Sequence, residues 1–187
     1  GATASRSSTG TVANSPTNAD GQVVTATQSA ISFRVPTGWQ VVSRDELTSL
    51  NTADPPRWLV DLAAGLGQTP AQIATAMRQA DLLVLGNPSG GPFAPNVNVV
   101  YPGPGVATLP SPEAMKAGLR RPGLTVLDGK SVKVAGGGRA VVVAYELTWG
   151  ETTTVKGRSV MYLHSPGHAG VITISTLDDA ESDRLLT

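Results

Sequence analysis

The sequence predicts an α+β fold in which a mainly antiparallel sheet is covered by helices. Two observations lead to this expectation. Short runs rich in β-branched residues lie toward both ends of the chain, and sequences typical of helix starts lie between them. In the second half, the β-rich runs are separated by turn sequences of only a few residues. Such short connections join antiparallel strands, because parallel strands need a crossover of about a dozen residues or more.

The first β-rich segment is expected to be a hairpin. The runs QVVTATQ and ISFRVP are separated only by Ser29 and Ala30. In the second run, the strand period of two places Ile31, Phe33 and Val35 on one face. Pro36 and Gly38 then interrupt the strand, and we expect the stretch PTGW to turn the chain directly into a helix, with Trp39 as a plug in the core.

Helix starts can be recognised from capping sequences. The patterns S-x-x-E and T-x-x-Q are capping boxes, and Ser or Thr before Pro is a further start signal. A helix after Pro56 would place Trp58, Leu59 and Leu62 on one side. The expected caps or first residues are Ser43, Pro56, Thr69, Ser111 and Asp178.

The remaining strands follow from runs of β-forming residues. We expect them at residues 81–87, 96–102, 124–128, 130–136, 139–149, 158–164 and 170–176. Asp128-Gly129 and Ser165-Pro166-Gly167 are expected turns, and the last three strands should form a meander. Residues expected on the buried face of the sheet are Phe33, Val35, Val142, Ala144 and Ile172.

Composition sets the domain organisation. A chain of 187 residues with 40 % hydrophobic content suits one domain preceded by a tether. Residues 1–21 are almost all Ala, Thr, Ser, Gly, Asn and Pro, with Val12 the only large apolar side chain. Such a segment cannot bury enough apolar surface to offset its chain entropy. We therefore expect a flexible low-complexity tether over residues 1–21 and a folded domain over residues 22–187.

Composition also disfavours several classes of function. Fourteen basic residues balance fourteen acidic ones, so no net field attracts nucleic acid or an anionic membrane. The chain has no cysteine, which excludes disulfides, thiolate nucleophiles and cysteine-ligated metals. We expect no nucleic-acid partner and no cofactor.

The order of motifs resembles that of a known superfamily. The stretch ISFRVPTGW is similar to the strand, proline, glycine and tryptophan signature of PsbP-like domains, the superfamily that includes LpqN-type bacterial lipoproteins. FAPNVNVV, then SPEAMKAGLRR before GLTVLDGKSVKVAGGGRAVVVAYEL, and finally TLDDAESDRLLT follow the same order. The resemblance covers roughly residues 22–187.

The resemblance implies an αβα sandwich that acts as a non-catalytic binding or assembly module. It also implies a location outside the cytoplasmic membrane, either anchored or secreted. The chain departs from a lipoprotein precursor because it has no lipobox cysteine. Any anchor to the membrane would therefore lie upstream of Gly1, and the chain itself would have no other membrane contact.

Local catalytic motifs are missing from the sequence. Ser89 lies among glycines in GNPSGG, but a nucleophile elbow needs G-x-S-x-G before a helix. A phosphate loop would need G-x-x-x-x-G-K-[ST]. We expect a non-enzymatic binding or accessory domain of the bacterial envelope. The alternative is a hydrolase whose active-site residues are distant in the sequence.

The loop at residues 87–95 is the expected recognition site, because loops carry recognition on a rigid scaffold. The expected ligand is an envelope protein or a small apolar molecule. The side chains expected to bind it are Asn87, Ser89, Phe93 and Asn96.

His164 and His168 are the only histidines and lie on either side of the expected turn. A three-residue turn would place them opposite each other on neighbouring strands, close enough to share a metal ion. Two imidazoles are an incomplete zinc site, because three or four protein ligands are usual. We therefore expect the pair to be the solvated end of a hairpin, with metal binding as the alternative.

Overall fold

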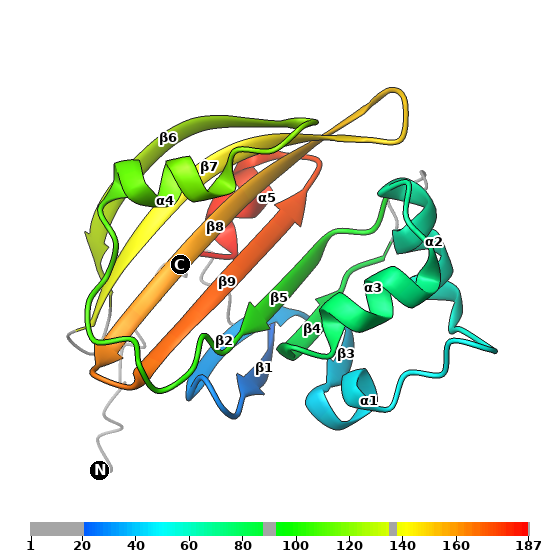
Figure 1. Cartoon of the computed structure of the whole chain (residues 1–187), viewed down its shortest axis with the longest axis horizontal. Helices are drawn as coiled ribbons and strands as arrows, with labels where there is room; N and C mark the ends of the chain where they lie inside the picture. Colours follow the sequence, from blue (N-terminus) through cyan, green and yellow to red (C-terminus); the bar gives the residue numbers. More distant parts are fainter. Residues whose placement is uncertain (1–20, 88–92, 135–137, 187) are drawn as a thin grey trace, which may run out of the picture.

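The fold is α+β, as the sequence predicts. The computed structural model describes residues 21–87, 93–134 and 138–186. These residues form a two-stranded hairpin and a seven-stranded sheet with the strand order β3-β4-β5-β9-β8-β7-β6 (Figure 1). Every neighbouring pair of strands is antiparallel. The meander of the last three strands is confirmed, because β7, β8 and β9 pair in sequence order.

The bounds of the elements are close to the expected ones. The hairpin consists of β1 (Gly21–Ala26) and β2 (Ile31–Pro36). The sheet contains β3 (Gln40–Ser43), β4 (Ala80–Leu85), β5 (Asn96–Val100), β6 (Leu124–Lys133), β7 (Arg139–Trp149), β8 (Thr153–Ser165) and β9 (His168–Thr176). The helices are α1 (Arg44–Thr48), α2 (Arg57–Gly65), α3 (Pro70–Met77), α4 (Pro112–Leu119) and α5 (Asp179–Arg184).

The helices begin where the capping sequences predict. Both capping boxes are formed, one before α1 by Ser43 and Glu46 and one before α3 by Thr69 and Gln72. The side chains of Ser111 and Asp178 likewise accept hydrogen bonds from the first turns of α4 and α5, and Pro56 is the N-cap of α2. These local signals are correct because the hydrogen bonds they form span only a few residues.

One face of the large sheet, which we call the helical face, is covered by α1 to α4 (Figure 1). Leu83 and Leu85 of β4 pack under Leu47 of α1. At the other end of the sheet, α4 packs on β6 and β7, and a Cβ atom at Gly129 would lie 3.1 Å from Cδ of Lys116. The helices thus cover the two ends of this face.

The opposite face, which we call the hairpin face, is covered by the β1–β2 hairpin and by α5. Val24 and Val35 of the hairpin are buried against Val97 and Ile174 of the large sheet. The predicted alternation within β2 is confirmed, because Ile31, Phe33 and Val35 are buried or half-buried while Ser32 and Arg34 are exposed. The other residues expected on this face are buried or half-buried: Val142, Ala144 and Ile172.

The region after Trp39 differs from the sequence prediction. The chain does not turn directly into a helix but first forms β3, and the hairpin is a separate sheet stacked on the large one. Strand β3 exists because its backbone pairs with β4, with Val42 opposite Leu83. Trp39 is half-buried and packs beside Gly86, where a Cβ atom would lie 2.8 Å from the indole ring.

Asp128-Gly129 is not a turn, which corrects a second prediction. Strand β6 runs through both residues, and its pairing with β7 shifts between Val126 and Gly129, as in a β-bulge. The strands expected before and after this Asp-Gly pair form a single strand, β6, because the eleven residues of β7 are long enough to pair with both parts. The Asp-Gly pair therefore bends an edge strand instead of reversing it.

The expected tether lies outside the described residues except for Gly21, which begins β1. Among the residues that the structure describes, no helix has the length and apolar character needed to cross a membrane.

A buried carboxylate fixes the hairpin to the sheet. Asp81 of β4 is 2 % exposed, and its Oδ2 atom accepts a hydrogen bond of 2.8 Å from the backbone N–H of Ser29 in the hairpin turn. In the described part of the chain, Oδ1 of Asp81 and Oγ of Ser29 have no hydrogen-bond partner. The hydrogen bond joins residues that are 52 positions apart in the sequence, so it connects the hairpin turn to the large sheet.

We predict that Asp81→Ala lowers the free energy of unfolding by about 1 to 3 kcal/mol, because the buried N–H of Ser29 loses its acceptor. Asp81→Asn should lose less, since its carbonyl oxygen can still accept this hydrogen bond. Urea denaturation of the two variants measures the difference. An equal loss in both would show that the hydrogen bond to Ser29 is unimportant.

Candidate functional site

The structure places the three described residues of the predicted recognition site in different environments. Asn87 follows β4 and is exposed, whereas Asn96 opens β5, is 7 % exposed and donates from Nδ2 to the carbonyl of Ala94. Phe93 is 2 % exposed. Ser89 lies outside the described residues. Of the three described residues, Asn87 alone has the exposure expected of a recognition loop.

Phe93 is buried, although the sequence prediction placed its side chain among those that bind a ligand. Its ring meets Trp149 edge to face, with centroids 5.0 Å apart, and both pack with Val155. Leu62 of α2 and Leu66, which caps the C-terminus of α2, lie against the same cluster. Phe93 is buried because α2 reaches the ends of β7 and β8, a contact that no local pattern predicts.

We now predict that Phe93→Ala costs about 3 to 5 kcal/mol of unfolding free energy, as for a buried aromatic side chain. Asn87→Ala is the matched loop variant and should leave stability nearly unchanged, because Asn87 is exposed. Thermal or urea unfolding tests both. A Phe93→Ala variant of normal stability would contradict the packing described above.

The two histidines do not lie opposite each other. His168 pairs with Ser165, and the register shifts between Leu163 and Ser165. The ring of His164 instead stacks on Tyr162, with centroids 6.5 Å apart. In the described ranges, no group of three or more His, Cys, Asp or Glu side chains could hold a metal ion. The alternative of a metal ion shared by His164 and His168 therefore has no support from their geometry.

Ser165 and His168 form the one serine–histidine contact at this turn, with Oγ 3.0 Å from Nδ1. The pair belongs to a tight hairpin turn, and His168 is exposed. A serine nucleophile needs a histidine that a third group orients, and the only hydrogen bond found for His168 among the described side chains is this one. The contact is thus adequately explained as part of the turn.

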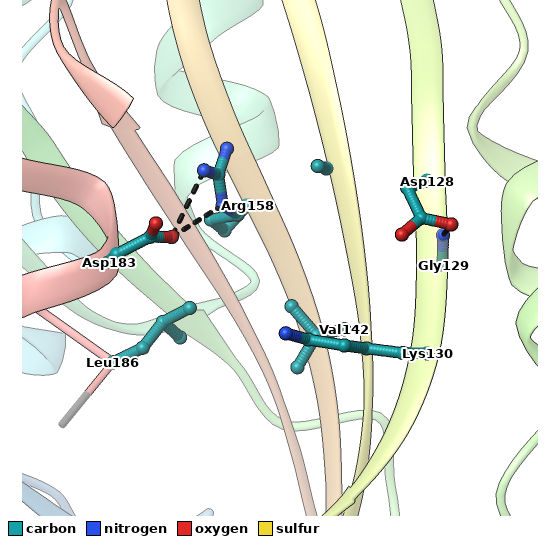
Figure 2. Close-up of a pocket in the computed structure, with 8 residues that line it drawn as sticks. Asp128, Gly129, Lys130, Val142, Arg158, Asp183 and Leu186 are labelled. Atoms are coloured by element: carbon teal, nitrogen blue, oxygen red, sulfur yellow. Dashed lines mark hydrogen bonds and ion pairs between the residues drawn. The ribbon is translucent and has the colours of Figure 1, made fainter. Parts of the chain in front are cut away.

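A pocket of about 200 Å³ lies on the hairpin face, between β6 to β8 and the end of α5 (Figure 2). Its lining combines charged and apolar side chains from four elements. The lining residues are Asp128, Gly129, Lys130, Val142, Ala144, Arg158, Asp183 and Leu186.

Arg158 forms the wall of the pocket nearest to α5. It is 8 % exposed, and its guanidinium donates to Asp183 at 3.0 Å, to Asp179 at 2.9 Å and to the carbonyl of Gly157 at 3.1 Å. Most of its donors are therefore engaged. Arg158 holds α5 on β8 and fixes the shape of the pocket.

Lys130 and Asp128 form the opposite rim. Both come from the bulged part of β6, and the Lys130 side chain extends across Val142 toward α5 (Figure 2). Oδ1 of Asp128 accepts a hydrogen bond of 2.7 Å from the N–H of Gly129. Neither side chain forms a salt bridge within the described residues. The ammonium group of Lys130 and the carboxylate of Asp128 thus remain available beside the apolar floor of the pocket, which consists of Val142, Ala144 and Leu186.

The helical face carries a band of uncharged polar side chains on β5, β7, β8 and β9. The members of this polar band are Asn96, Asn98, Tyr145, Ser159, Thr173 and Ser175. Register places Asn98 opposite Thr173 and Thr173 opposite Ser159. Tyr145 lies across Gly157, and its hydroxyl is 3.4 Å from that of Ser175.

Burial raises the pKa of the Tyr145 hydroxyl, while the hydrogen bond with Ser175 and the charge of Arg121 offset part of the effect. A raised pKa in the folded state means that the unfolded chain loses this proton first. The corresponding stability is present below the unfolded pKa of about 10 and is lost as the pH rises above it.

We predict that Tyr145→Phe weakens the loss of stability above about pH 10, because the variant has no hydroxyl to ionise at this position. Urea unfolding at neutral pH and at several alkaline pH values measures the slope in both proteins. An unchanged slope would contradict the role of Tyr145.

A comparison with models of known protein families and with curated proteins found no match to this chain. The resemblance to PsbP-like domains therefore remains a prediction.

Proposed function

We propose that the chain is a non-catalytic binding domain whose pocket beneath α5 holds a small ligand with charges of both signs. The observation that carries this proposal is the unpaired rim, where Lys130 and Asp128 lie beside an apolar floor. An ammonium and a carboxylate without ion-pair partners can each accept a group of opposite charge on the ligand.

The size of the pocket supports a small ligand. Its volume of about 200 Å³ lies below the range of about 300 to 1,000 Å³ usual for drug-sized ligands. Val142, Ala144 and Leu186 can contact a short aliphatic group. A wholly apolar ligand fits less well, because burying the charged rim without partners costs free energy.

The lining supports binding over catalysis. It contains carboxylates and cations but no serine, threonine, cysteine or histidine. Asp183 is already hydrogen-bonded to Arg158, so its carboxylate has a structural role. The hydrolase alternative would have to use residues elsewhere, and among the described residues the feature that favours it is the contact between Ser165 and His168.

The same proposal includes an extracytoplasmic location and a PsbP-like αβα arrangement. The location is supported by the composition of residues 1–21 and by the resemblance described above. The arrangement is supported by helices on one face of the antiparallel sheet and by α5 and the hairpin on the other.

Isothermal titration with three related compounds tests the proposal. Leucine carries both charges, isocaproate lacks the ammonium group, and isoamylamine lacks the carboxylate. We predict that leucine binds at least about tenfold more tightly than either analogue, because each charge-assisted hydrogen bond contributes about 1.5 to 3 kcal/mol.

Lys130→Met and Asp128→Asn should each weaken leucine binding by about tenfold or more. Lys133→Met is the matched control, because Lys133 also lies on β6 but does not line the pocket. Equal binding of all three compounds, or equal effects of both lysine substitutions, would contradict the proposal.

A further inference from the structure

The bulge of strand β6 holds a side chain against the peptide bond that follows it. Oδ1 of Asp128 accepts a hydrogen bond of 2.7 Å from the backbone N–H of Gly129 (Figure 2). Because Cγ of Asp128 is bonded to this oxygen, Cγ also lies beside the nitrogen of Gly129. A bond between two atoms forms most readily when the structure already holds them close together. The geometry therefore favours ring closure between Cγ and this nitrogen.

Glycine is the residue that obstructs this ring closure least, because it has no side chain beside the attacking nitrogen. Packing on the helical face also requires glycine here. A Cβ atom at Gly129 would lie 3.1 Å from Cδ of Lys116 and 3.3 Å from Cβ of Pro112, both in α4. The contact between α4 and β6 thus favours the same residue that leaves Asp128 reactive.

The bulge leaves the backbone at Asp128 less constrained than the rest of β6. The pairing with β7 is interrupted between Val126 and Gly129, so Leu127 and Asp128 have no partner residue on that strand. Among the described residues, β6 is the last strand of its sheet, and no strand pairs with its outer edge. A regular ladder on both sides would resist the rotation that ring closure needs, and it is missing here.

The side chain of Asp128 is also accessible to water. The residue is exposed, and within the described residues its carboxyl group takes part in no salt bridge. The hydrogen bond found for this carboxyl group is the one from Gly129. No other contact shown for Asp128 therefore holds the carboxyl group away from the peptide nitrogen.

We propose that Asp128 is a site of spontaneous modification, at which aspartate converts to isoaspartate through a cyclic succinimide. In the first step, the nitrogen of Gly129 attacks Cγ of the protonated carboxyl group, and an N–C bond forms. The bond between Cγ and the hydroxyl oxygen breaks. This oxygen leaves as water, and it takes with it the carboxyl proton and the proton of the Gly129 nitrogen.

In the second step, water adds to one of the two carbonyl carbons of the ring and opens it. Opening at Cγ restores aspartate, whereas opening at the backbone carbonyl carbon of Asp128 gives isoaspartate. The main chain then runs through Cβ and Cγ and is longer by one carbon atom, and the carboxylate is bonded directly to Cα. Water is the only co-reactant, and no electrons are transferred.

The modification would alter the rim of the pocket beneath α5. Asp128 and Lys130 both line this pocket, and Lys130 lies opposite Val142 in the register of β6 and β7. An additional backbone atom between Asp128 and Gly129 displaces the carboxylate and shifts Lys130 along β7. The reaction itself does not depend on the pocket having a ligand, so it can be tested separately from the proposed function.

Peptide mapping of the folded protein, aged at neutral pH in water enriched in heavy oxygen, tests the proposal. Each opening of the ring adds one heavy oxygen atom from the water. Trypsin digestion in ordinary water gives a peptide of residues 121–130, in which Asp128 is the only aspartate. We expect this peptide to gain heavy oxygen and to separate into an aspartyl and an isoaspartyl form of equal mass. The chain's other Asp-Gly pair, Asp20-Gly21, lies in a different tryptic peptide.

Two substitutions of Asp128 provide matched comparisons. Asp128→Glu keeps the charge but needs a larger ring, so we expect at least about tenfold less heavy oxygen in the peptide, equivalent to about 1.4 kcal/mol in the activation free energy. Asp128→Asn keeps an acceptor oxygen and loses ammonia instead of water. It should react at least about tenfold faster at neutral pH and give both aspartate and isoaspartate. The melting temperature of each variant shows whether it remains folded.

Three results would overturn the proposal. The first is the absence of heavy oxygen from the peptide of the folded protein; labelling of a synthetic peptide of the same sequence would then show that the fold prevents ring closure. The second is equal labelling of the original chain and Asp128→Glu. The third is conversion of Asp128→Asn to aspartate without isoaspartate, because direct hydrolysis of the amide would then bypass the ring.

Discussion

Strand β9 pairs with β5 on one side and with β8 on the other, and this pairing joins the two halves of the large sheet. The first half contains β3, β4 and β5, and the second contains β6, β7 and β8. These halves come from separate parts of the chain, and no other strand connects them. The fold is therefore complete only when the last strand has entered the middle of the sheet, which is a contact of high sequence separation.

The pocket and the polar band both depend on β9. Thr173 and Ser175 are the central members of the polar band, and their register aligns Asn98 with Ser159. Helix α5 follows β9 directly and has only six residues, too few to be stable in isolation. It is held by Arg158 and by the buried hydrogen bond between Thr176 and Ser182. The pocket wall is thus a consequence of how β9 is placed.

Local chemistry explains what the sequence could predict. Capping boxes and prolines act over one helical turn, so the starts of α1 to α5 were correctly predicted from a few residues each. The period of two within one strand likewise predicted the buried side of β2. These features are independent of where the partner strand comes from.

Contacts between distant segments explain what could not be predicted. Strand β3 is only four residues long and exists through its pairing with β4. The Asp-Gly pair of β6 has the composition of a turn, but a long partner strand makes it a bulge. Phe93 is buried by α2 from an earlier part of the chain. The pocket and the polar band are of this kind, because their residues meet only after the register of the sheet is set.

Arg158 and Ser159 show how closely the two regions are placed. They are neighbours on β8, and successive side chains of a strand point to opposite faces, so one belongs to the pocket and the other to the polar band. A ligand in the pocket would bind the folded state only and would stabilise the strands that carry Arg158 and Val142.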